Sequence, residues 1–162
     1  MKDLINYLRN KFIFLNEMKF RHLELYDYNN NFLDLFKSFS SDINYDKILF
    51  DEYYSNYLSS NKVIYILELN NIILGSISLL FDQKIFHNYN ISIQIEDLVV
   101  NKNIRNNKIG TLLLSTVKNL IEEVNTIEYM IYKIILNCDD KLENFYTKNG
   151  FIKKGNYMTY YI

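Results

Sequence analysis

The sequence predicts a single α+β domain built around a mixed β-sheet. Its 162 residues suffice for one domain with a hydrophobic core, and no repeat, linker or shift in composition divides them. The spacing of apolar residues changes several times along the chain, from helical spacing to the alternation of strands and back. After a short leading helix, these changes give the element order β-α-α-β-β-β-α-β-α-β.

The first third is predicted to be mostly helical. Apolar residues at helical spacing predict a leading helix in residues 2–12, and residues 18–27 alternate like a strand. Helical spacing returns in residues 26–39 and again in residues 45–58, with a polar break between them. Residues 1–15 form an N-terminal helical extension to the domain, and the leading helix is either a dimer contact or an appendage.

Strands dominate the middle of the chain. Residues 62–81 contain two β-rich runs around Asn70-Asn71, and asparagine supplies the left-handed residues of a hairpin turn. Residues 90–100 first alternate and then become continuously apolar at Leu98-Val99-Val100. We therefore expect a long strand whose second half is buried on both faces.

Helices and strands alternate in the last third. The predicted elements are a helix at 110–124, a strand at 129–138, a helix at 139–149 and a closing strand or hairpin at 151–162. Asp139 or Asp140 is the expected N-cap of the second helix, and Gly150 is its expected C-terminal stop.

The composition excludes several classes of protein. A net charge of -1 gives no ground for binding nucleic acid or an anionic membrane. The single cysteine, Cys138, excludes a disulfide framework, and His22 and His87 lack the spacing of a metal site. The first twenty residues contain no apolar run of the length that a signal or membrane segment needs, so we expect a soluble cytoplasmic protein.

The stretch Ile104–Val124 predicts an anion-binding loop. Arg105 and Lys108 precede Gly110, which stands at the start of an amphipathic helix. The N–H groups of a first helical turn and the positive end of the helix dipole favour a phosphate group. Neither the Walker pattern nor a Rossmann G-x-G-x-x-G is present. The alternative is a solvated basic turn that caps the helix.

Three motifs together resemble one enzyme superfamily. They are the acidic pair Glu96-Asp97, the basic loop that ends at Gly110, and the stretch "ENFYTKNGF" (143–151). The arrangement resembles the GCN5-related N-acetyltransferases (GNAT), and residues 81–158 closely resemble the glucosamine 6-phosphate N-acetyltransferases. The resemblance implies a largely antiparallel, twisted sheet that is splayed at an acetyl-CoA site and flanked by helices.

The resemblance implies acetyl-CoA as the cosubstrate and no metal. In the family, the loop and helix N-terminus hold the pyrophosphate, the strand after the acidic pair binds the pantetheine, and the tyrosine lies near the sulfur. The implied acetyl-CoA-binding residues are Leu98, Val99, Val100, Arg105, Asn106, Asn107, Lys108, Ile109, Gly110, Thr111, Lys141 and Tyr146. Lys108 stands where some relatives have glycine.

Glu96, Asp97 and Tyr146 are the expected catalytic residues. An ammonium substrate must lose a proton before its nitrogen attacks a thioester, and a carboxylate can pass that proton to water. The N–H of Leu98 is the simplest oxyanion donor, and a phenol can protonate or stabilise the departing thiolate. The alternatives are an exposed charge pair and a tyrosine used for packing, since the chain has 15 tyrosines.

The resemblance also implies D-glucosamine 6-phosphate as the substrate and an intertwined homodimer. The implied substrate-binding residues are Lys84, Glu96, Asp97, Asn137, Cys138 and Tyr161, with Ser40 and Ser41 in the region of the family's substrate loop. We expect Cys138 to be a buried structural thiol rather than a nucleophile.

Two departures from the family pattern concern the substrate and the cofactor. Tyr161 replaces an arginine that helps to bind the sugar phosphate, and Leu142 replaces an asparagine that often contacts CoA. Two alternatives to the sugar-phosphate enzyme therefore stay open. One is an acetyltransferase for another amine, such as a polyamine, an aminoglycoside or a protein N-terminus. The other is a non-catalytic acyl-CoA-binding module.

Overall fold

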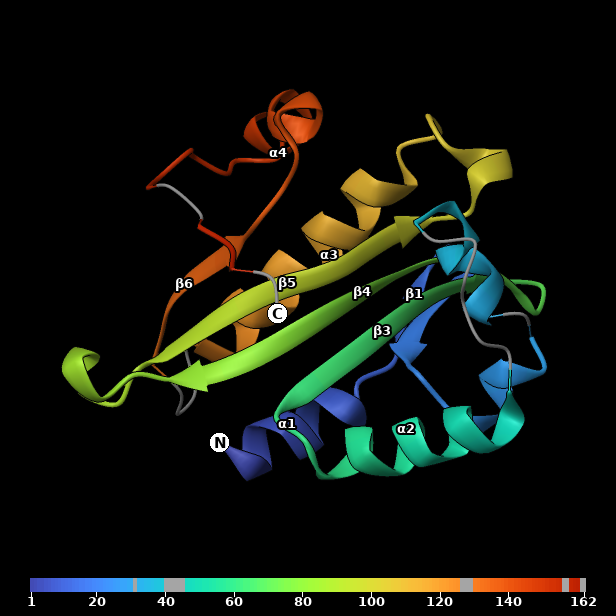
Figure 1. Cartoon of the computed structure of the whole chain (residues 1–162), viewed down its shortest axis with the longest axis horizontal. Helices are drawn as coiled ribbons and strands as arrows, with labels where there is room; N and C mark the ends of the chain where they lie inside the picture. Colours follow the sequence, from blue (N-terminus) through green and yellow to red (C-terminus); the bar gives the residue numbers. More distant parts are fainter. Residues whose placement is uncertain (31, 40–45, 126–129, 156–157, 161–162) are drawn as a thin grey trace.

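The computed structural model describes residues 1–30, 32–39, 46–125, 130–155 and 158–160, and a six-stranded sheet forms its centre (Figure 1). The strands are β1 (Ile13–Leu15), β2 (Met18–His22), β3 (Lys62–Leu69), β4 (Ile72–Gln83), β5 (Ile91–Val100) and β6 (Ile131–Leu136). They lie in the order β1-β2-β3-β4-β5-β6, and all neighbours are antiparallel except β5 and β6. The single α+β domain with a mixed, largely antiparallel sheet is therefore confirmed.

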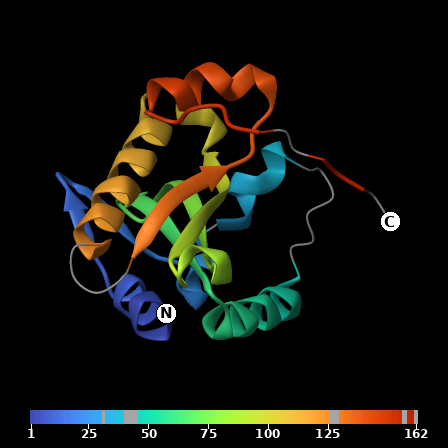
Figure 2. The ribbon, with the colours of Figure 1, turned by 90° about the vertical axis from the view of Figure 1, so that its left-hand side faces the viewer.

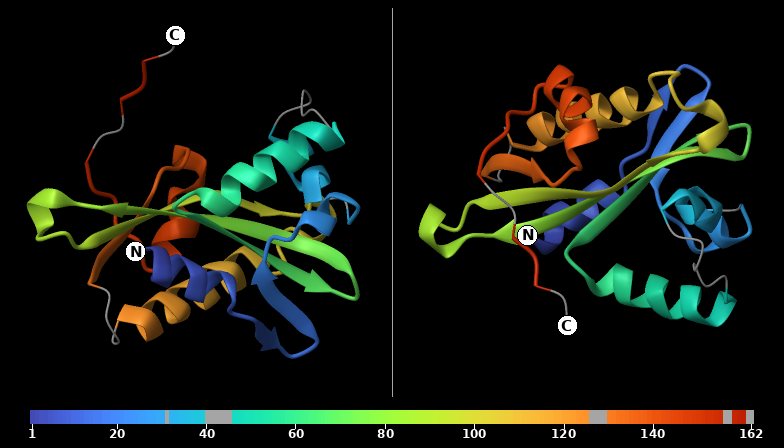
Figure 3. Two further views of the ribbon diagram at one scale, coloured as in Figure 1. Left: turned by 90° about the horizontal axis from the view of Figure 1, so that it is seen from below. Right: turned by 45° about the horizontal axis from the view of Figure 1, so that its top comes forward.

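Helices cover both faces of this sheet. The α-helices are α1 (Lys2–Arg9), α2 (Lys47–Ser59), α3 (Ile109–Asn125) and α4 (Glu143–Lys148). The 3-10 segments are η1 (Leu25–Tyr28), η2 (Phe32–Ser38), η3 (Ile85–His87), η4 (Lys102–Ile104) and η5 (Asp140–Leu142). Apolar side chains of α1 and α3 form one core cluster with the sheet, whereas η2 and α2 form a second cluster on the opposite face (Figure 3).

The leading helix α1 belongs to the core. Leu4, Ile5 and Leu8 are at most 4% exposed and pack in the same cluster as α3. Arg9 donates a 2.7 Å hydrogen bond to the backbone oxygen of Tyr57 in the last turn of α2, a position where helix carbonyls lack intrahelical partners. The interpretation of this helix as an appendage is therefore wrong.

Two predictions for the first third of the chain need correction. In place of the helix expected at residues 26–39, the described residues form the 3-10 segments η1 and η2. Asn29 and Asn30 lie between these segments, and asparagine side chains compete for backbone hydrogen bonds and favour turns. The strand β1 was not predicted, because three residues are too few to show an alternation.

The middle of the chain follows its predicted pattern. Asn70 and Asn71 take left-handed φ values of 50° and 63° in the turn between β3 and β4, which is the geometry that a two-residue hairpin requires. The predicted helices at 45–58 and 110–124 correspond to α2 and α3 within two residues.

The end of the chain departs from its prediction. α4 begins only at Glu143 and has Leu142 as its N-cap, while Asp139 precedes η5 without a side-chain cap bond. Gly150 follows the helix at φ 86°, as a C-terminal stop should. The described residues of the expected closing strand, 151–155 and 158–160, form no strand, because they pair with no sheet edge and a strand needs such a partner.

A β-bulge interrupts β5 at the acidic pair. Between the pair Ser78–Glu96 and the pair Ser76–Val99, β5 contains one residue more than β4. Asp97 lies in this bulge with a left-handed φ of 48°, a conformation that aspartate tolerates better than most side chains. The extra residue shifts the alternation of side chains by one position for the rest of the strand.

The shift in alternation is visible in the two core clusters. Ile91, Ile93 and Ile95 belong to the cluster of α3, whereas Val99, also an odd-numbered position, belongs to the cluster of α2. Val99 is 2% exposed, but Leu98 and Val100 are only half-buried. The prediction that the second half of this strand is buried on both faces therefore holds for one face only.

β5 and β6 pair along only half of their length. The parallel register runs from Ile91–Ile131 to Ile95–Leu136, where β6 ends. From Glu96 to Val100, β5 has β4 on one side and no paired strand on the other within the described residues. The two strands separate toward their C-terminal ends in Figure 1, which is the splayed sheet that the sequence predicts.

Candidate active site

The bulge brings both carboxylates of the acidic pair to one face of the sheet. Glu96 and Asp97 are consecutive and would point to opposite faces in a regular strand. Both instead contact Lys62 of β3, whose Nζ lies 3.2 Å from Glu96 Oε2 and 3.6 Å from Asp97 Oδ2. Ser78 of β4 donates a 3.3 Å hydrogen bond to Asp97 Oδ2. Three adjacent strands therefore contribute to one polar cluster.

The charges of this cluster act on one another. Burial on its own would lower the pKa of Lys62, but Tyr53, Asp97 and Glu96 together outweigh it, so the pKa is raised and the lysine stays cationic. Burial raises the pKa of the phenol of Tyr53, which lies on α2 across from the cluster. With two carboxylates and one ammonium, the cluster has a formal net charge of -1.

The basic loop between β5 and α3 carries its charges at the surface. Arg105, Asn106, Asn107 and Lys108 are all exposed, and Arg105 Nε donates a 3.3 Å hydrogen bond to the oxygen of Val100 at the end of β5. Asn106 and Lys108 have left-handed φ values of 69° and 61°. Glycine would adopt the second of these conformations without steric cost, whereas a side chain there costs roughly 1–2 kcal/mol.

At Gly110, the start of α3 packs closely against α4. A Cβ on Gly110 would lie 3.2 Å from the Phe145 ring and 3.7 Å from the Val100 side chain. The first turn of α3 therefore lies against both α4 and the end of β5, and its leading N–H groups lack intrahelical acceptors. A basic loop, a helix N-terminus and an uncovered strand edge converge here, and this combination fits a molecule with a pyrophosphate and an amide-rich arm.

α4 lies beside α3 (Figure 2). Lys118 of α3 donates a 2.7 Å hydrogen bond to the backbone oxygen of Asn149 at the end of α4. Within and just after α4, the Tyr146 ring packs edge-on against Phe145 at 5.0 Å and against Phe151 at 5.9 Å between centroids. The position of the Tyr146 phenol is therefore fixed by packing on two sides.

The phenol of Tyr146 is suited to donate a proton. Burial raises the pKa of Tyr146, and the negative form of Cys138 adds to the effect. The phenol therefore keeps its proton across the neutral range.

Asn137 and Cys138 follow β6 and are exposed, as is Lys141. The prediction that Cys138 is a buried structural thiol is therefore wrong, because β6 ends at Leu136 and the chain leaves the sheet there. Burial, followed by Glu143 and its acidic neighbours, raises the pKa of Cys138, so a thiolate nucleophile is disfavoured. Lys141 forms a 2.9 Å ion pair with Asp139 at the surface.

The remaining predicted substrate residues do not join this site within the described chain. Lys84 lies at the far end of the β4–β5 hairpin, where it forms an ion pair with Asp82. Lys84 is six positions further along the chain than Ser78, which corresponds to about 20 Å in an extended strand. Tyr161, Ser40 and Ser41 lie outside the described residues.

Sequence reasoning missed Lys62, Ser78 and Tyr53. A lysine at the start of a strand is usually exposed to solvent. The sequence around Lys62 therefore gives no indication that this residue belongs to a functional site. Its ion pairs with residues more than thirty positions away arise only from the sheet register and the bulge. The described residues contain no cluster of three or more potential metal ligands, and none of their helices has the length and apolar character to cross a membrane.

Known proteins resemble this chain in sequence and in fold. Residues 29–159 match the family model for the acetyltransferase (GNAT) domain. A probable glucosamine 6-phosphate N-acetyltransferase of Drosophila melanogaster is 33% identical over 138 residues, which cover 83% of this chain and 61% of the relative. The chain thus spans less than two thirds of that relative's length. The glucosamine 6-phosphate N-acetyltransferase of Candida albicans is 27% identical over 82% of this chain and 87% of its own.

A solved structure extends the comparison to the fold. The crystal structure of glucosamine-6-phosphate N-acetyltransferase from Arabidopsis thaliana superimposes with a TM-score of 0.79 at 24% identity, over 89% of this chain and 97% of that one. The family model covers most of the chain. The chain therefore belongs to the GNAT acetyltransferase family.

Proposed function

We propose that this chain transfers the acetyl group of acetyl-CoA to the amine of D-glucosamine 6-phosphate, giving N-acetylglucosamine 6-phosphate for UDP-N-acetylglucosamine synthesis. The observation that carries the proposal is the bulge that turns Glu96 and Asp97 to one face beside the uncovered edge of β5. The names of the two relatives support the choice of sugar phosphate. The cytoplasmic location stays a prediction from the sequence.

Acetyl-CoA supplies an activated thioester, and the chain supplies the groups that hold it. We assign its pantetheine to the free edge of Leu98–Val100, where it would add to the sheet as a strand does. We assign its pyrophosphate to the loop from Arg105 to Gly110 and the first turn of α3. Thr111, Lys141 and Tyr146 complete the proposed contact surface.

In the proposed reaction, the residues act directly on a ternary complex. Glu96 and Asp97 hold the ammonium of the substrate and pass one of its protons to water. The amine nitrogen then attacks the thioester carbonyl, and the Leu98 N–H stabilises the charge on the oxygen. Tyr146 gives its proton to the sulfur as the carbon–sulfur bond breaks, and the second proton of the amine nitrogen returns to the Tyr146 oxygen as the amide forms. Most of the acceleration comes from positioning the two substrates.

The cofactor assignment predicts a change in the KM for acetyl-CoA. Replacing Arg105 and Lys108 together with alanine removes two cations from the pyrophosphate, and we expect the KM to rise by about tenfold or more. The kcat should change little, because neither residue contacts the reacting atoms. Lys102→Ala is a matched control, since Lys102 is an exposed cation in the adjoining η4 segment. An unchanged KM in the double variant would remove the loop from the cofactor site.

The substrate assignment is tested by a thiol-release assay with two sugars. We expect glucosamine 6-phosphate to give a kcat/KM at least about tenfold above that of glucosamine, because a phosphate adds charge-assisted hydrogen bonds. Equal rates for the two sugars would show that no phosphate site exists. If neither sugar releases CoA thiol while another amine does, the chain is an acetyltransferase with a different substrate.

We propose a homodimer as the assembly that completes the sugar-phosphate site. Lys84 is remote from Asp97 within one chain, and the hairpin that carries it exposes Ile85 (78%), Phe86 (78%) and Tyr89 (65%). A contiguous apolar tip of this kind is typical of an interface. Sedimentation of the wild type should give a dimer, and Phe86→Asp should give a monomer. A monomeric wild type at micromolar concentration would contradict the proposal.

A further inference from the structure

A polar pocket lies at the end of the sheet where β5 ends and β4 begins (Figure 1). It has a volume of about 550 Å³ and is enclosed by η2, the β3–β4 turn and η4. Pockets of roughly 300–1,000 Å³ typically hold small organic ligands. Its lining contains no residue of the acidic cluster and none of the loop from Arg105 to Gly110.

The pocket lies on the sheet face opposite α3. Its inner wall contains Leu35 and Ile73, which are 5% and 4% exposed and belong to the core cluster of η2 and α2. α3 packs in the other core cluster, and the pyrophosphate of acetyl-CoA is assigned to its first turn. A ligand in this pocket and acetyl-CoA can therefore be bound at the same time.

Side-chain amides dominate the polar part of the lining. The asparagines that contribute are Asn29, Asn30, Asn71, Asn101 and Asn103. The side-chain oxygen of Asn101 accepts a 3.1 Å hydrogen bond from the N–H of Asn103, whereas the other four side chains form no hydrogen bond with another described residue. Each amide offers one acceptor and two donors, so the pocket suits a ligand whose edges carry both kinds of group.

The charged side chains give the pocket two different ends. At η2, Lys37 and Asp34 form an ion pair at 2.7 Å, and the carboxylate can also accept hydrogen bonds from hydroxyl groups. At η4, Lys102 is exposed and forms no ion pair with a described residue. A phosphate group is therefore favoured beside Lys102, away from the carboxylate of Asp34.

The aliphatic part of the lining favours a flat ring. Ile72 at the start of β4 is 59% exposed and lies in the pocket beside the buried Ile73. A ring that covers this side chain removes apolar surface from water. Inorganic phosphate would use only Lys102, and a nucleoside without phosphate would leave Lys102 unused. A nucleoside monophosphate has the ring, the hydroxyl groups and the phosphate together.

We propose that this pocket is a second ligand site, which binds a nucleoside monophosphate with its phosphate at Lys102 and its base against Ile72. The asparagine amides contact the edge of the base and the ribose. This site is separate from the proposed acetyl transfer, and its ligand is not acetylated.

The test is an NMR titration of the ¹⁵N-labelled full chain with UMP in the presence of saturating CoA. CoA contains no uracil, and its presence blocks nucleotide binding at the acetyl-CoA site. We expect a saturable change with a dissociation constant of about 1 mM or below. The side-chain amide signals of Asn30, Asn71 and Asn103 should shift. Uridine and inorganic phosphate should each bind at least about tenfold more weakly.

Two variants with matched controls test the assigned contacts. Lys102→Ala removes the cation and should raise the dissociation constant for UMP about tenfold, and Asn30→Ala should raise it several-fold. Lys154→Ala and Asn6→Ala remove an exposed lysine and an exposed asparagine outside the pocket. Both controls should bind UMP like the wild type. An unchanged melting temperature of each variant would separate lost contacts from lost folding.

Several results would overturn the inference. One is the absence of saturable shifts, and another is equal binding of inorganic phosphate and UMP. Shifts that vanish when CoA is added would assign the nucleotide to the acetyl-CoA site. None of these results bears on acetylation of glucosamine 6-phosphate, which is measured by CoA release without UMP, so the two proposals stand or fall separately.

Discussion

Replacement of Tyr146 by phenylalanine is expected to lower kcat about a hundredfold or more, while the KM for acetyl-CoA stays near the wild-type value. The substitution removes one oxygen and keeps the ring that packs against Phe145 and Phe151. General acid catalysis by a positioned side chain typically contributes 10²–10⁴-fold, which sets the expected size of the loss at roughly that order. Steady-state kinetics with both substrates would measure the two parameters separately.

The pKa of Tyr146 adds a pH criterion to this prediction. Because burial raises that pKa above its usual value of 10.0, the phenol is protonated throughout the neutral range. Deprotonation of the Tyr146 phenol should therefore reduce kcat in the wild type only at strongly alkaline pH. The Tyr146→Phe variant should lack that alkaline decline.

Tyr160→Phe is the matched control for Tyr146→Phe, since Tyr160 is 90% exposed and lies beyond α4. It should leave kcat unchanged. A wild-type kcat in Tyr146→Phe would show that another group protonates the sulfur, or that the thiolate leaves without an acid.

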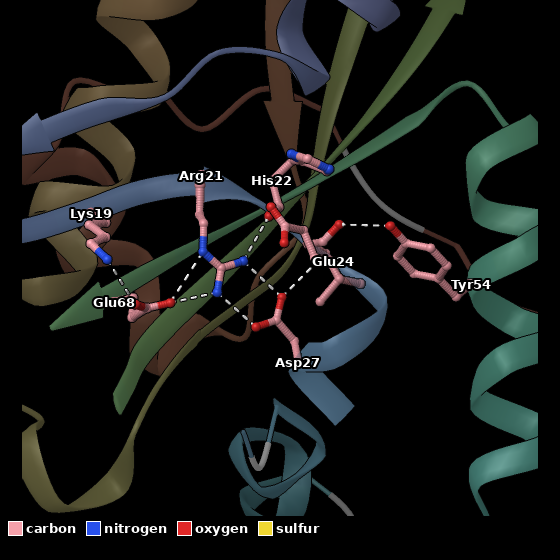
Figure 4. A network of polar contacts seen from close by, with 8 residues as sticks. Lys19, Arg21, His22, Glu24, Asp27, Tyr54 and Glu68 are labelled. Carbon is pink, nitrogen blue, oxygen red and sulfur yellow. Dashed lines mark hydrogen bonds and ion pairs between the residues drawn. The ribbon is translucent and has the colours of Figure 1, made fainter. Parts of the chain in front are cut away.

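The second large effect is expected at Arg21, the centre of a buried ionic network (Figure 4). Arg21, Asp27 and Glu68 are at most 4% exposed. The guanidinium of Arg21 donates two hydrogen bonds to Asp27, at 2.9 and 2.8 Å, and two to Glu68 Oε2, at 3.2 and 2.5 Å. Asp27 also accepts a 2.8 Å hydrogen bond from the N–H of Glu24, which fixes the start of η1.

Arg21→Met should lower the free energy of unfolding by about 3–5 kcal/mol. The methionine fills similar space but leaves two carboxylates buried without their cation, and breaking a buried ion pair in this way typically costs that much. Urea denaturation followed by far-UV circular dichroism would measure the change. This loss is large relative to the stability of a typical domain, so a part of the variant is expected to be unfolded at 37 °C.

Lys19→Met is the matched control for Arg21→Met. The Nζ atom of Lys19 lies 3.8 Å from Glu68 Oε1, but its side chain is 44% exposed. A solvated ion pair contributes at most about 1 kcal/mol, so this variant should remain nearly as stable as the wild type. Similar losses in both variants would mean that the charge of Arg21 is not the source of its effect.

The network also has a consequence for the site, because it holds η1 in place and η1 leads into η2. Phe32, Leu33 and Phe36 of η2 line an apolar pocket beside Asp97. Glu68 is 47 residues from Arg21 in the sequence, so no local pattern could reveal that these residues meet. The alternation of residues 18–27 predicts only that Arg21 lies on a strand, as it does in β2.

The sequence alone determined the features that depend on near neighbours. The period of apolar residues gave the long strands and α2 and α3, Asn70 and Asn71 gave the hairpin, and Gly150 gave the end of α4. The basic loop before Gly110 and the acidic pair could be found in the same way, because the residue types and their spacing are local. Together with the stretch 143–151, those motifs were enough to predict the family and its cosubstrate.

Only the tertiary structure decided how the candidate site is built. The bulge at Asp97 depends on the register between β4 and β5, and one extra residue is what turns both carboxylates toward Lys62 on a third strand. The 3-10 form of η1 and η2, the core position of α1 and the apolar pocket likewise depend on packing between distant segments. The free energy of such contacts comes from burial and charge pairing across the fold, which the periodicity of a single segment does not encode.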